Sequence, residues 1–214
     1  MEKTTRIGRF KLYLSKDVYI PGEDTFLLED ILRNQIKMKP ELCCDLGCGS
    51  GYLSLVLKEL YPNCTLYSVD INSSALEITE KNLELNSMNK NTYVIKSYLF
   101  RNLGKKFLKN PKFDLLIFNP PYLPEDLYET KDLIDEALLG GNKTGDRIII
   151  EFLESLVINK KKFFHKTSKI ILLISSWNKE AKNFIERNKD LKIESKIKSK
   201  YSFETLTCFV LSIY

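Results

Sequence analysis

The sequence predicts an α/β fold, a doubly wound, mostly parallel seven-stranded sheet with one antiparallel strand near the C-terminus. Three observations support this prediction. Apolar, strand-like runs alternate with helix-like stretches along most of the chain, which is the pattern of a parallel sheet covered by helices. A glycine-rich turn follows the first of the alternating strands. The last two strand-like runs have no long helix between them, so we expect them to form an antiparallel hairpin.

Local patterns give the elements in chain order. Residues 41–47 are expected to form a strand that enters the glycine turn, and residues 50–62 have apolar residues at helical spacing up to a terminating proline. A second strand covers 64–70, and either Asn72 or Ser73 caps the next helix. The remaining expected elements are strands at 91–96 and 112–118, a helix at 145–158, a strand at 168–175, a helix at 178–188, and strands at 191–200 and 204–214.

The composition is that of an ordinary globular protein. Of 214 residues, 43% are hydrophobic and 29% charged, so we expect one domain over residues 1–214 with an N-terminal extension at 1–20. No apolar run approaches the roughly 20 residues of a membrane span, and the N-terminus lacks the apolar core of a signal peptide. The five cysteines form no CxxC pair. We therefore expect reduced thiols in a cytoplasmic or nuclear protein.

Charge is unevenly distributed along the chain. Residues 17–157 contain fifteen basic and 22 acidic residues, whereas residues 158–200 contain thirteen basic and four acidic ones. The basic region fits contact with a nucleic acid or a ribosomal partner, but a solvated surface explains it as well and is favoured. The single histidine, His165, argues against a Ser-His-Asp triad and against a His-based metal site, so no metal is expected.

The first chemical motif is the turn Asp45-Leu46-Gly47-Cys48-Gly49-Ser50-Gly51, called the glycine turn below. Glycines let the backbone approach a ligand closely, and the following helix N-terminus offers free amide donors. The second strand ends in Asp70, where an acid can accept hydrogen bonds from ribose hydroxyls. Together these features predict a nucleoside cofactor. The DxGxGxG spacing resembles that of the Rossmann-like class I S-adenosylmethionine-dependent methyltransferases, and S-adenosylmethionine is the cofactor that this resemblance implies.

The second motif is Asn119-Pro120-Pro121-Tyr122 at the end of the strand at 112–118. This NPPY motif resembles that of methyltransferases acting on planar nitrogen, such as an adenine amine or a glutamine amide. In such a fold the strand lies beside the first one, so Asn119 is expected close to the cofactor's methyl group. The Asn119 side-chain oxygen and the Pro120 carbonyl can each accept an N–H bond from the substrate, and Tyr122 offers a flat wall. A stiff turn with a packed tyrosine is the structural alternative.

A third stretch, residues 17–28 (DVYIPGEDTFLL), resembles the opening signature of the eukaryotic and archaeal HemK-type glutamine methyltransferases. These enzymes methylate the GGQ loop of class I translation termination factors. The resemblance implies that Thr25 approaches the cofactor carboxylate; without it, Thr25 is a helix N-cap. The implied cofactor-binding residues are Thr25, Asp45, Gly47, Cys48, Gly49, Asp70, Ile71, Ser97, Tyr98 and Asn119, and the implied catalytic residues are Asn119, Pro120, Pro121 and Tyr122.

One feature departs from the family pattern. The family usually has an acid after the third strand to bind the cofactor's adenine amine, and here the stretch is Lys96-Ser97-Tyr98-Leu99. Ser97 or a backbone group must then take that role. The family also implies a small zinc-binding activator as a heterodimer partner, which would dock on the edge strand 91–95.

Several alternatives remain open from the sequence. An adenine methyltransferase acting on DNA also fits NPPY, although little chain is left for reading DNA, so nucleic acid is not favoured as a partner. A lysine-directed methyltransferase, a non-catalytic cofactor-binding subunit and a nicotinamide dehydrogenase fit the motifs less well. The sequence does not indicate whether residues 123–146 form an ordered lid.

Overall fold

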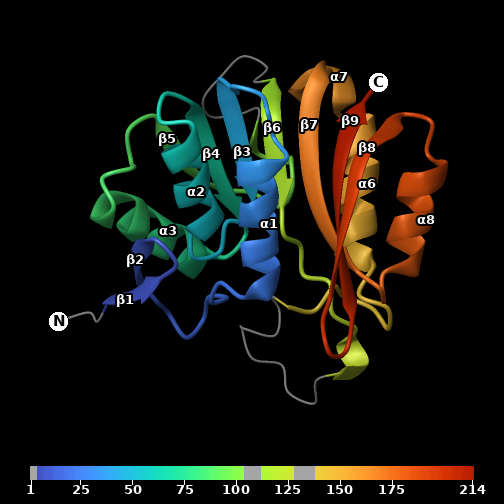
Figure 1. The fold of residues 1–214 in the computed structure, drawn as a ribbon, viewed down its shortest axis with the longest axis horizontal. Coiled ribbons are helices and arrows are strands. Elements are labelled where there is room, and N and C mark those ends of the chain that lie inside the picture. Colours follow the sequence, from blue (N-terminus) through green and yellow to red (C-terminus); the bar gives the residue numbers. More distant parts are fainter. Residues whose placement is uncertain (1–3, 104–111, 128–137) are drawn as a thin grey trace. The chain divides into compact units, whose positions relative to one another are not determined.

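The computed structural model describes residues 4–103, 112–127 and 138–214 (Figure 1). Contacts within the chain cluster into two compact units, residues 1–109 and 110–214. The expectation of one domain over residues 1–214 stays a prediction, and each unit is described by itself. Residues 128–137 of the 123–146 segment lie outside the described residues.

The first unit contains a small hairpin and a three-stranded parallel sheet in the order β5-β4-β3. Its elements are β1 (Thr4–Ile7), β2 (Phe10–Tyr13), α1 (Glu23–Asn34), β3 (Leu42–Leu46), α2 (Tyr52–Leu60), β4 (Thr65–Asp70), α3 (Ser73–Leu85) and β5 (Thr92–Lys96). Figure 1 shows β5 at the outer edge of this sheet, as predicted for the strand at 91–95. The hairpin β1–β2 falls in the predicted N-terminal extension and was not expected.

Helix starts in the first unit follow local chemistry. The Asn72 side chain caps α3 by accepting a hydrogen bond from the Ser74 amide at 2.9 Å, which confirms one of the two predicted caps. The alternative reading of Thr25 as an N-cap is wrong, because α1 begins at Glu23 with Gly22 as its cap residue. Two acids in the first turn, Glu23 and Asp24, favour that start since they lie at the positive end of the helix dipole.

Polar contacts hold α1 against α2. Arg33 on α1 bonds Glu29 at 2.8 Å and also pairs with Glu59 on α2. The Tyr52 hydroxyl, at the start of α2, donates to Glu29 at 2.7 Å. These bonds fix the N-terminal half of the unit, so the first turn of α1, which contains Thr25, is held in place relative to the glycine turn.

The second unit contains a four-stranded sheet in the order β6-β7-β9-β8. Its elements are β6 (Phe113–Phe118), the 3-10 turn η1 (Glu125–Leu127), α6 (Arg147–Ile158), α7 (Lys160–Phe163), β7 (Phe164–Ser175), α8 (Lys179–Arg187), β8 (Leu191–Lys200) and β9 (Thr205–Ile213). Strands β6 and β7 are parallel, whereas β9 runs antiparallel to both β7 and β8. The predicted C-terminal hairpin is therefore confirmed.

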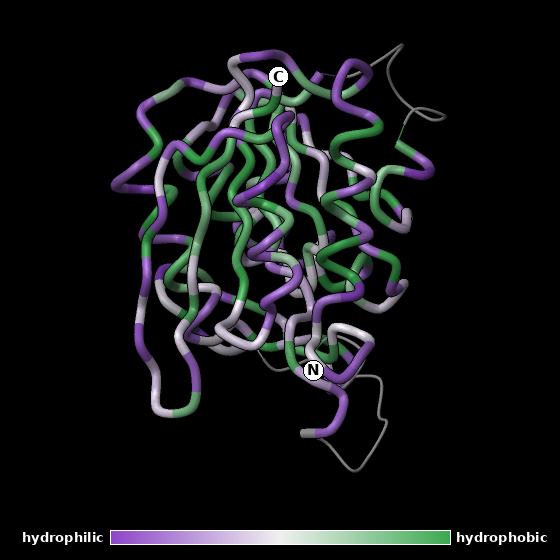
Figure 2. The backbone as a smooth tube through the Cα atoms, turned by 90° about the vertical axis from the view of Figure 1, so that its right-hand side faces the viewer, coloured by the Kyte–Doolittle hydropathy of each residue, from purple (hydrophilic) through white to green (hydrophobic). Residues whose placement is uncertain are grey.

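The seven main strands confirm the predicted fold class, a mostly parallel α/β sheet with one antiparallel strand near the C-terminus. Strand β9 and the second half of β7 are almost entirely buried, while β8 alternates between exposed and half-buried residues after its first position. The same alternation of hydrophilic and hydrophobic residues is visible along the outer strand of the long hairpin in Figure 2. Within the described residues, no helix has the length and apolarity needed to cross a membrane.

Candidate active site

The glycine turn is tied by its backbone to the end of β4. The amides of Gly47 and Cys48 both donate to the Val69 carbonyl, at 2.7 and 3.0 Å. The Gly49 amide donates to the Asp70 carboxylate at 3.0 Å. The predicted cofactor residues of β3 and β4 are therefore brought together in one connected loop structure.

Gly49 leaves one side of this turn open. Its φ of +53° lies in the left-handed region, and a Cβ atom added there would meet nothing within 4 Å. The neighbouring residues are held by hydrogen bonds, so the open side belongs to a fixed backbone and not to a loose loop. This is the arrangement in which a ligand can pack directly against the backbone.

Asp45 is a buried acid below the turn. Its carboxylate accepts a hydrogen bond from the Ser54 hydroxyl at 2.6 Å, and Ser54 in turn contacts the Ser68 hydroxyl at 2.7 Å. Burial raises the pKa of Asp45 to about 7, the charge of Asp70 adds to the rise, and the Ser54 bond opposes it. A cation beside Asp45 would offset the cost of keeping this carboxylate ionised in the interior.

Asp70 organises two loops at the carboxyl end of β4. One carboxylate oxygen accepts from Gly49, and the other accepts from the Asn72 amide at 2.9 Å. Burial raises the pKa of Asp70, although the amide bonds from Asn72 and Gly49 lower it. Each carboxylate oxygen has two acceptor positions, so hydrogen bonds from ribose hydroxyls remain compatible with these contacts. Next to it, Ile71 is 58% exposed, an apolar side chain available to a flat ring.

Thr25 belongs to a small buried cluster that the sequence did not reveal. Asp24 accepts hydrogen bonds from the Thr25 amide at 2.6 Å, the Thr25 hydroxyl at 3.2 Å and the Tyr19 hydroxyl at 2.8 Å. All three residues lie in the 17–28 signature, so their closeness in the sequence is the signal from which this cluster could have been predicted. Asp24 fixes the orientation of the Thr25 side chain.

Ser97 has a local structural role in this structure. Its hydroxyl donates to the Leu99 carbonyl at 3.0 Å and accepts from the Asn102 amide at 3.0 Å, which shapes the turn after β5. Its amide donates to the Asp70 carbonyl at 2.9 Å. Tyr98 lies beneath the Arg101 guanidinium, 4.8 Å from the ring centre. Roles for Ser97 and Tyr98 in adenine binding stay predictions.

The NPPY motif follows β6 directly, as expected. Asn119 and Pro121 are half-buried, while Pro120 and Tyr122 are buried. The Tyr122 amide donates to the Leu138 carbonyl at 3.1 Å, and its carbonyl accepts from the Asn178 side chain at 2.9 Å. The motif is thus a fixed strand-end structure. The approach of Asn119 to the cofactor's methyl group stays a prediction.

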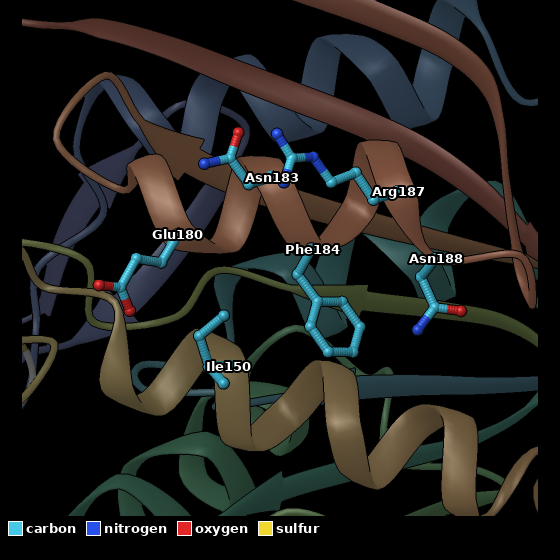
Figure 3. A pocket seen from close by; sticks show the side chains of 6 residues that line it. All are labelled: Ile150, Glu180, Asn183, Phe184, Arg187 and Asn188. Carbon is cyan, nitrogen blue, oxygen red and sulfur yellow. The ribbon is translucent and has the colours of Figure 1, made fainter.

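A shallow groove occurs elsewhere in the second unit, between α6 and α8 (Figure 3). Its lining residues are Ile150, Glu180, Asn183, Phe184, Arg187 and Asn188. None of the predicted site residues is among them. This groove is not the site indicated by the motifs.

Comparison with known proteins identifies the family. Residues 24–149 match the methyltransferase small domain. The chain belongs to this family. A relative from Methanocaldococcus jannaschii, named "Putative protein N5-glutamine methyltransferase", is 32% identical over 202 residues and is matched over 94% of each chain. The eRF1 methyltransferase catalytic subunit of Schizosaccharomyces pombe is 35% identical over 143 residues, covering 60% of this chain and 61% of the relative.

These relatives confirm the resemblance of this methyltransferase to the HemK-type glutamine methyltransferases. The chain spans only 26% to 50% of the length of four bacterial relatives, three of which are named release factor glutamine methyltransferase. A crystal structure of a ribosomal protein L11 methylase from Lactobacillus delbrueckii matches 94% of this chain and 83% of its own, with a TM-score of 0.63. At 17% identity it supports the fold alone.

Proposed function

We propose that this protein transfers a methyl group from S-adenosylmethionine to the side-chain amide of the glutamine in the GGQ motif of a class I translation termination factor. The observation that carries the proposal is the NPPY motif at the end of β6 in a chain matched over 94% of its length by a relative named "Putative protein N5-glutamine methyltransferase". Four further relatives reported above are named for release factors.

The first unit offers the groups that S-adenosylmethionine requires. Asp45 suits the cofactor's positively charged methionine end, since a buried carboxylate gains most from a cationic partner. Asp70 accepts from the ribose hydroxyls, and the exposed side chain of Ile71 covers one face of the adenine. The Thr25 hydroxyl, which donates to Asp24 in this structure, can donate to the carboxylate of the cofactor instead. The open side of Gly49 lets the cofactor pack on the backbone.

The second unit supplies acceptors for a neutral amide. A glutamine nitrogen is a poor nucleophile because its lone pair is delocalised into the carbonyl. Hydrogen bonds from its two N–H groups to the Asn119 side-chain oxygen and the Pro120 carbonyl favour a more pyramidal, more nucleophilic nitrogen. The C–S bond of the donor breaks as the N–C bond forms, and the product nitrogen then loses one proton to water. Orientation of this kind can contribute about 7–11 kcal/mol.

A partner subunit is part of the proposal. The fission yeast relative is named as a catalytic subunit, which supports the expectation of a heterodimer. Strand β5 is the outer strand of the first unit's sheet and is only five residues long, with Tyr93 39% exposed. An edge strand of this kind can accept a strand from a small zinc-binding activator.

Mass spectrometry tests the proposed function directly. The protein, co-expressed with its activator, is incubated with methyl-labelled S-adenosylmethionine and either the termination factor or duplex DNA. We expect one added methyl group on the GGQ glutamine and none on the DNA. Methylated adenine together with an unmodified termination factor would favour the alternative of a DNA adenine methyltransferase. Methylated lysine would instead favour a lysine-directed methyltransferase.

A further inference from the structure

We propose that Asn178, which precedes α8, is a positioning residue for the NPPY motif. It acts through the Tyr122 carbonyl and sets how Asn119 and Pro120 are presented. This inference rests on the proposed function for its catalytic consequence. Its structural part, the control of the loop that follows β6, can be measured without any substrate.

The Asn178 side chain makes three hydrogen bonds, all to backbone groups. The amide nitrogen donates to the Tyr122 carbonyl and to the Thr144 carbonyl, both at 2.9 Å. The amide oxygen accepts from the Ser175 N–H at 2.7 Å. The residue is only 1% exposed. One neutral side chain therefore joins three loops, those after β6, before α6 and after β7, because an amide has two donors and an acceptor in one plane.

The other side of the motif is equally constrained. The amides of Tyr122 and Leu123 both donate to the Leu138 carbonyl, at 3.1 and 2.9 Å. Gly145 packs so closely that an added Cβ would lie 2.1 Å from the Tyr122 carbonyl oxygen, and its φ of +68° favours glycine as well. The Tyr122 peptide is thus held from both faces, and Asn178 donates a side-chain hydrogen bond to its carbonyl.

Two more polar residues, the half-buried Asn142 and the buried Asp146, secure the same loop. Asn142 accepts from the Asp146 amide at 2.8 Å, and its carbonyl accepts from the Glu125 amide at 3.1 Å. Asp146, fully buried, accepts from the Ala181 amide in the first turn of α8 at 2.9 Å. The segment 142–146 therefore bridges the residues after NPPY to the helix that Asn178 begins.

The consequence for catalysis follows from the two prolines. Their fixed φ angles leave little freedom between Asn119 and Tyr122, so a displaced Tyr122 carbonyl changes the direction of the Pro120 carbonyl. Misplacing these acceptors lowers the rate of transfer. It leaves cofactor affinity unchanged, because the proposed cofactor residues other than Asn119 belong to the first unit.

The experiment compares Asn178→Ala and Asn178→Asp with Asn183→Ala, a matched control. Asn183 lies on the same helix, is exposed, and lines the groove in Figure 3. We expect kcat for the termination factor to fall roughly 10- to 100-fold in Asn178→Ala, with the dissociation constant for S-adenosylmethionine unchanged. Asn178→Asp should lose more, because its carboxylate would face two carbonyl oxygens. The control should match the wild type.

Hydrogen exchange of the heterodimer, measured by peptide mass, gives the readout that needs no substrate. In Asn178→Ala, peptides covering residues 119–127 should exchange about tenfold faster, while peptides of the glycine turn keep their rates. Unchanged exchange in 119–127 would overturn the inference. So would a kcat loss that disappears when rates are expressed per cofactor-binding site, because that loss would come only from misfolded protein. Inactivity of the wild type on the termination factor would instead remove the proposed function and leave the exchange result standing.

Discussion

The two units differ in the chemistry they place at the ends of their parallel strands. In the first, buried carboxylates dominate: Asp45 and Asp70 both have raised pKa values and both accept hydrogen bonds from the surrounding chain. In the second, neutral amides take that place, with Asn119 ending β6 and Asn178 joining the loops. The difference matches the proposed ligands, since a cationic, ribose-bearing donor needs acids and a neutral glutamine amide needs neutral acceptors.

This contrast predicts that the two units control different properties of the enzyme. Changes in the first unit should act on cofactor affinity, and changes in the NPPY motif should act on turnover. The outer strands of the two units also differ. Strand β5 is short and carries few charges, whereas β8 has exposed lysines along its length. Four changes test the contrast, from the largest expected effect to the smallest.

Replacing Asn119 by alanine should have the largest effect. The variant loses the side-chain acceptor that orients the substrate nitrogen, so kcat should fall by roughly 100- to 1000-fold. The dissociation constant for S-adenosylmethionine, measured by calorimetry, should change by less than about twofold because the other proposed cofactor-binding residues lie in the first unit. Full activity in this variant would assign the chemistry to another site.

Replacing Asp70 by asparagine should show the opposite pattern. The amide keeps one acceptor but cannot satisfy both the Gly49 and Asn72 amides, and it loses the charge that strengthens ribose bonds. We expect S-adenosylmethionine affinity to fall by roughly 10- to 100-fold, with kcat at saturating cofactor nearly preserved. Asp126→Asn, an exposed acid in the second unit, is the control. A lower kcat with unchanged S-adenosylmethionine affinity in Asp70→Asn would contradict the assignment of cofactor binding to the first unit and turnover to the second.

The raised pKa of Asp45 predicts a pH dependence. The pKa of Asp45 in the folded protein, about 7, lies above the ordinary 3.8. The contribution of Asp45 to the free energy of unfolding is therefore fully present below pH 3.8 and is lost as pH rises towards 7. The cofactor's positive charge favours the ionised acid, so affinity should rise with pH by up to about tenfold per unit below that pKa. Calorimetry between pH 5.5 and about 8 measures this. A pH dependence that persists in Asp45→Asn would assign the titration to another group.

Adding charge to the edge strand β5 should have the smallest effect, and it should act only on binding of the activator. Tyr93→Lys and Val94→Lys together make β5 resemble β8, and charged edges resist strand addition. We expect activator binding to weaken by about tenfold, with S-adenosylmethionine affinity of the remaining folded protein retained. The control is Lys198→Tyr on β8, which should leave the complex intact. If only the β8 variant loses the activator, the docking strand is the wrong one.

Most of the fold could be predicted because its signals are local. Strand β8 was predicted with its observed bounds, and the glycine turn and NPPY motif mark strand ends that the structure confirms. The hairpin β1–β2 was missed because its strands are only four residues long. It is held from outside: Asn82 bonds both the amide and the carbonyl of Tyr13, at 2.7 and 3.1 Å, and Asn86 does the same for Lys11.

The candidate site was predictable in part. Motif spacing identified Asp70 and Asn119, because glycine turns, strand-end acids and prolines have conformational meaning within a few residues. The same reasoning could not foresee that Ser97 uses its hydroxyl to shape its own turn. Nor could it find Asn178, which lies 56 residues beyond Tyr122 and looks like an ordinary helix cap.

The sequence by itself determined the alternation of strands and helices, the antiparallel ending and the two motifs, since apolar periodicity and the special backbones of glycine and proline act over short distances. Only the tertiary structure decided the pKa of Asp45 and the anchoring of Tyr122 by Asn178. Burial and hydrogen bonds between distant residues depend on which segments pack together. No short stretch of sequence contains that information.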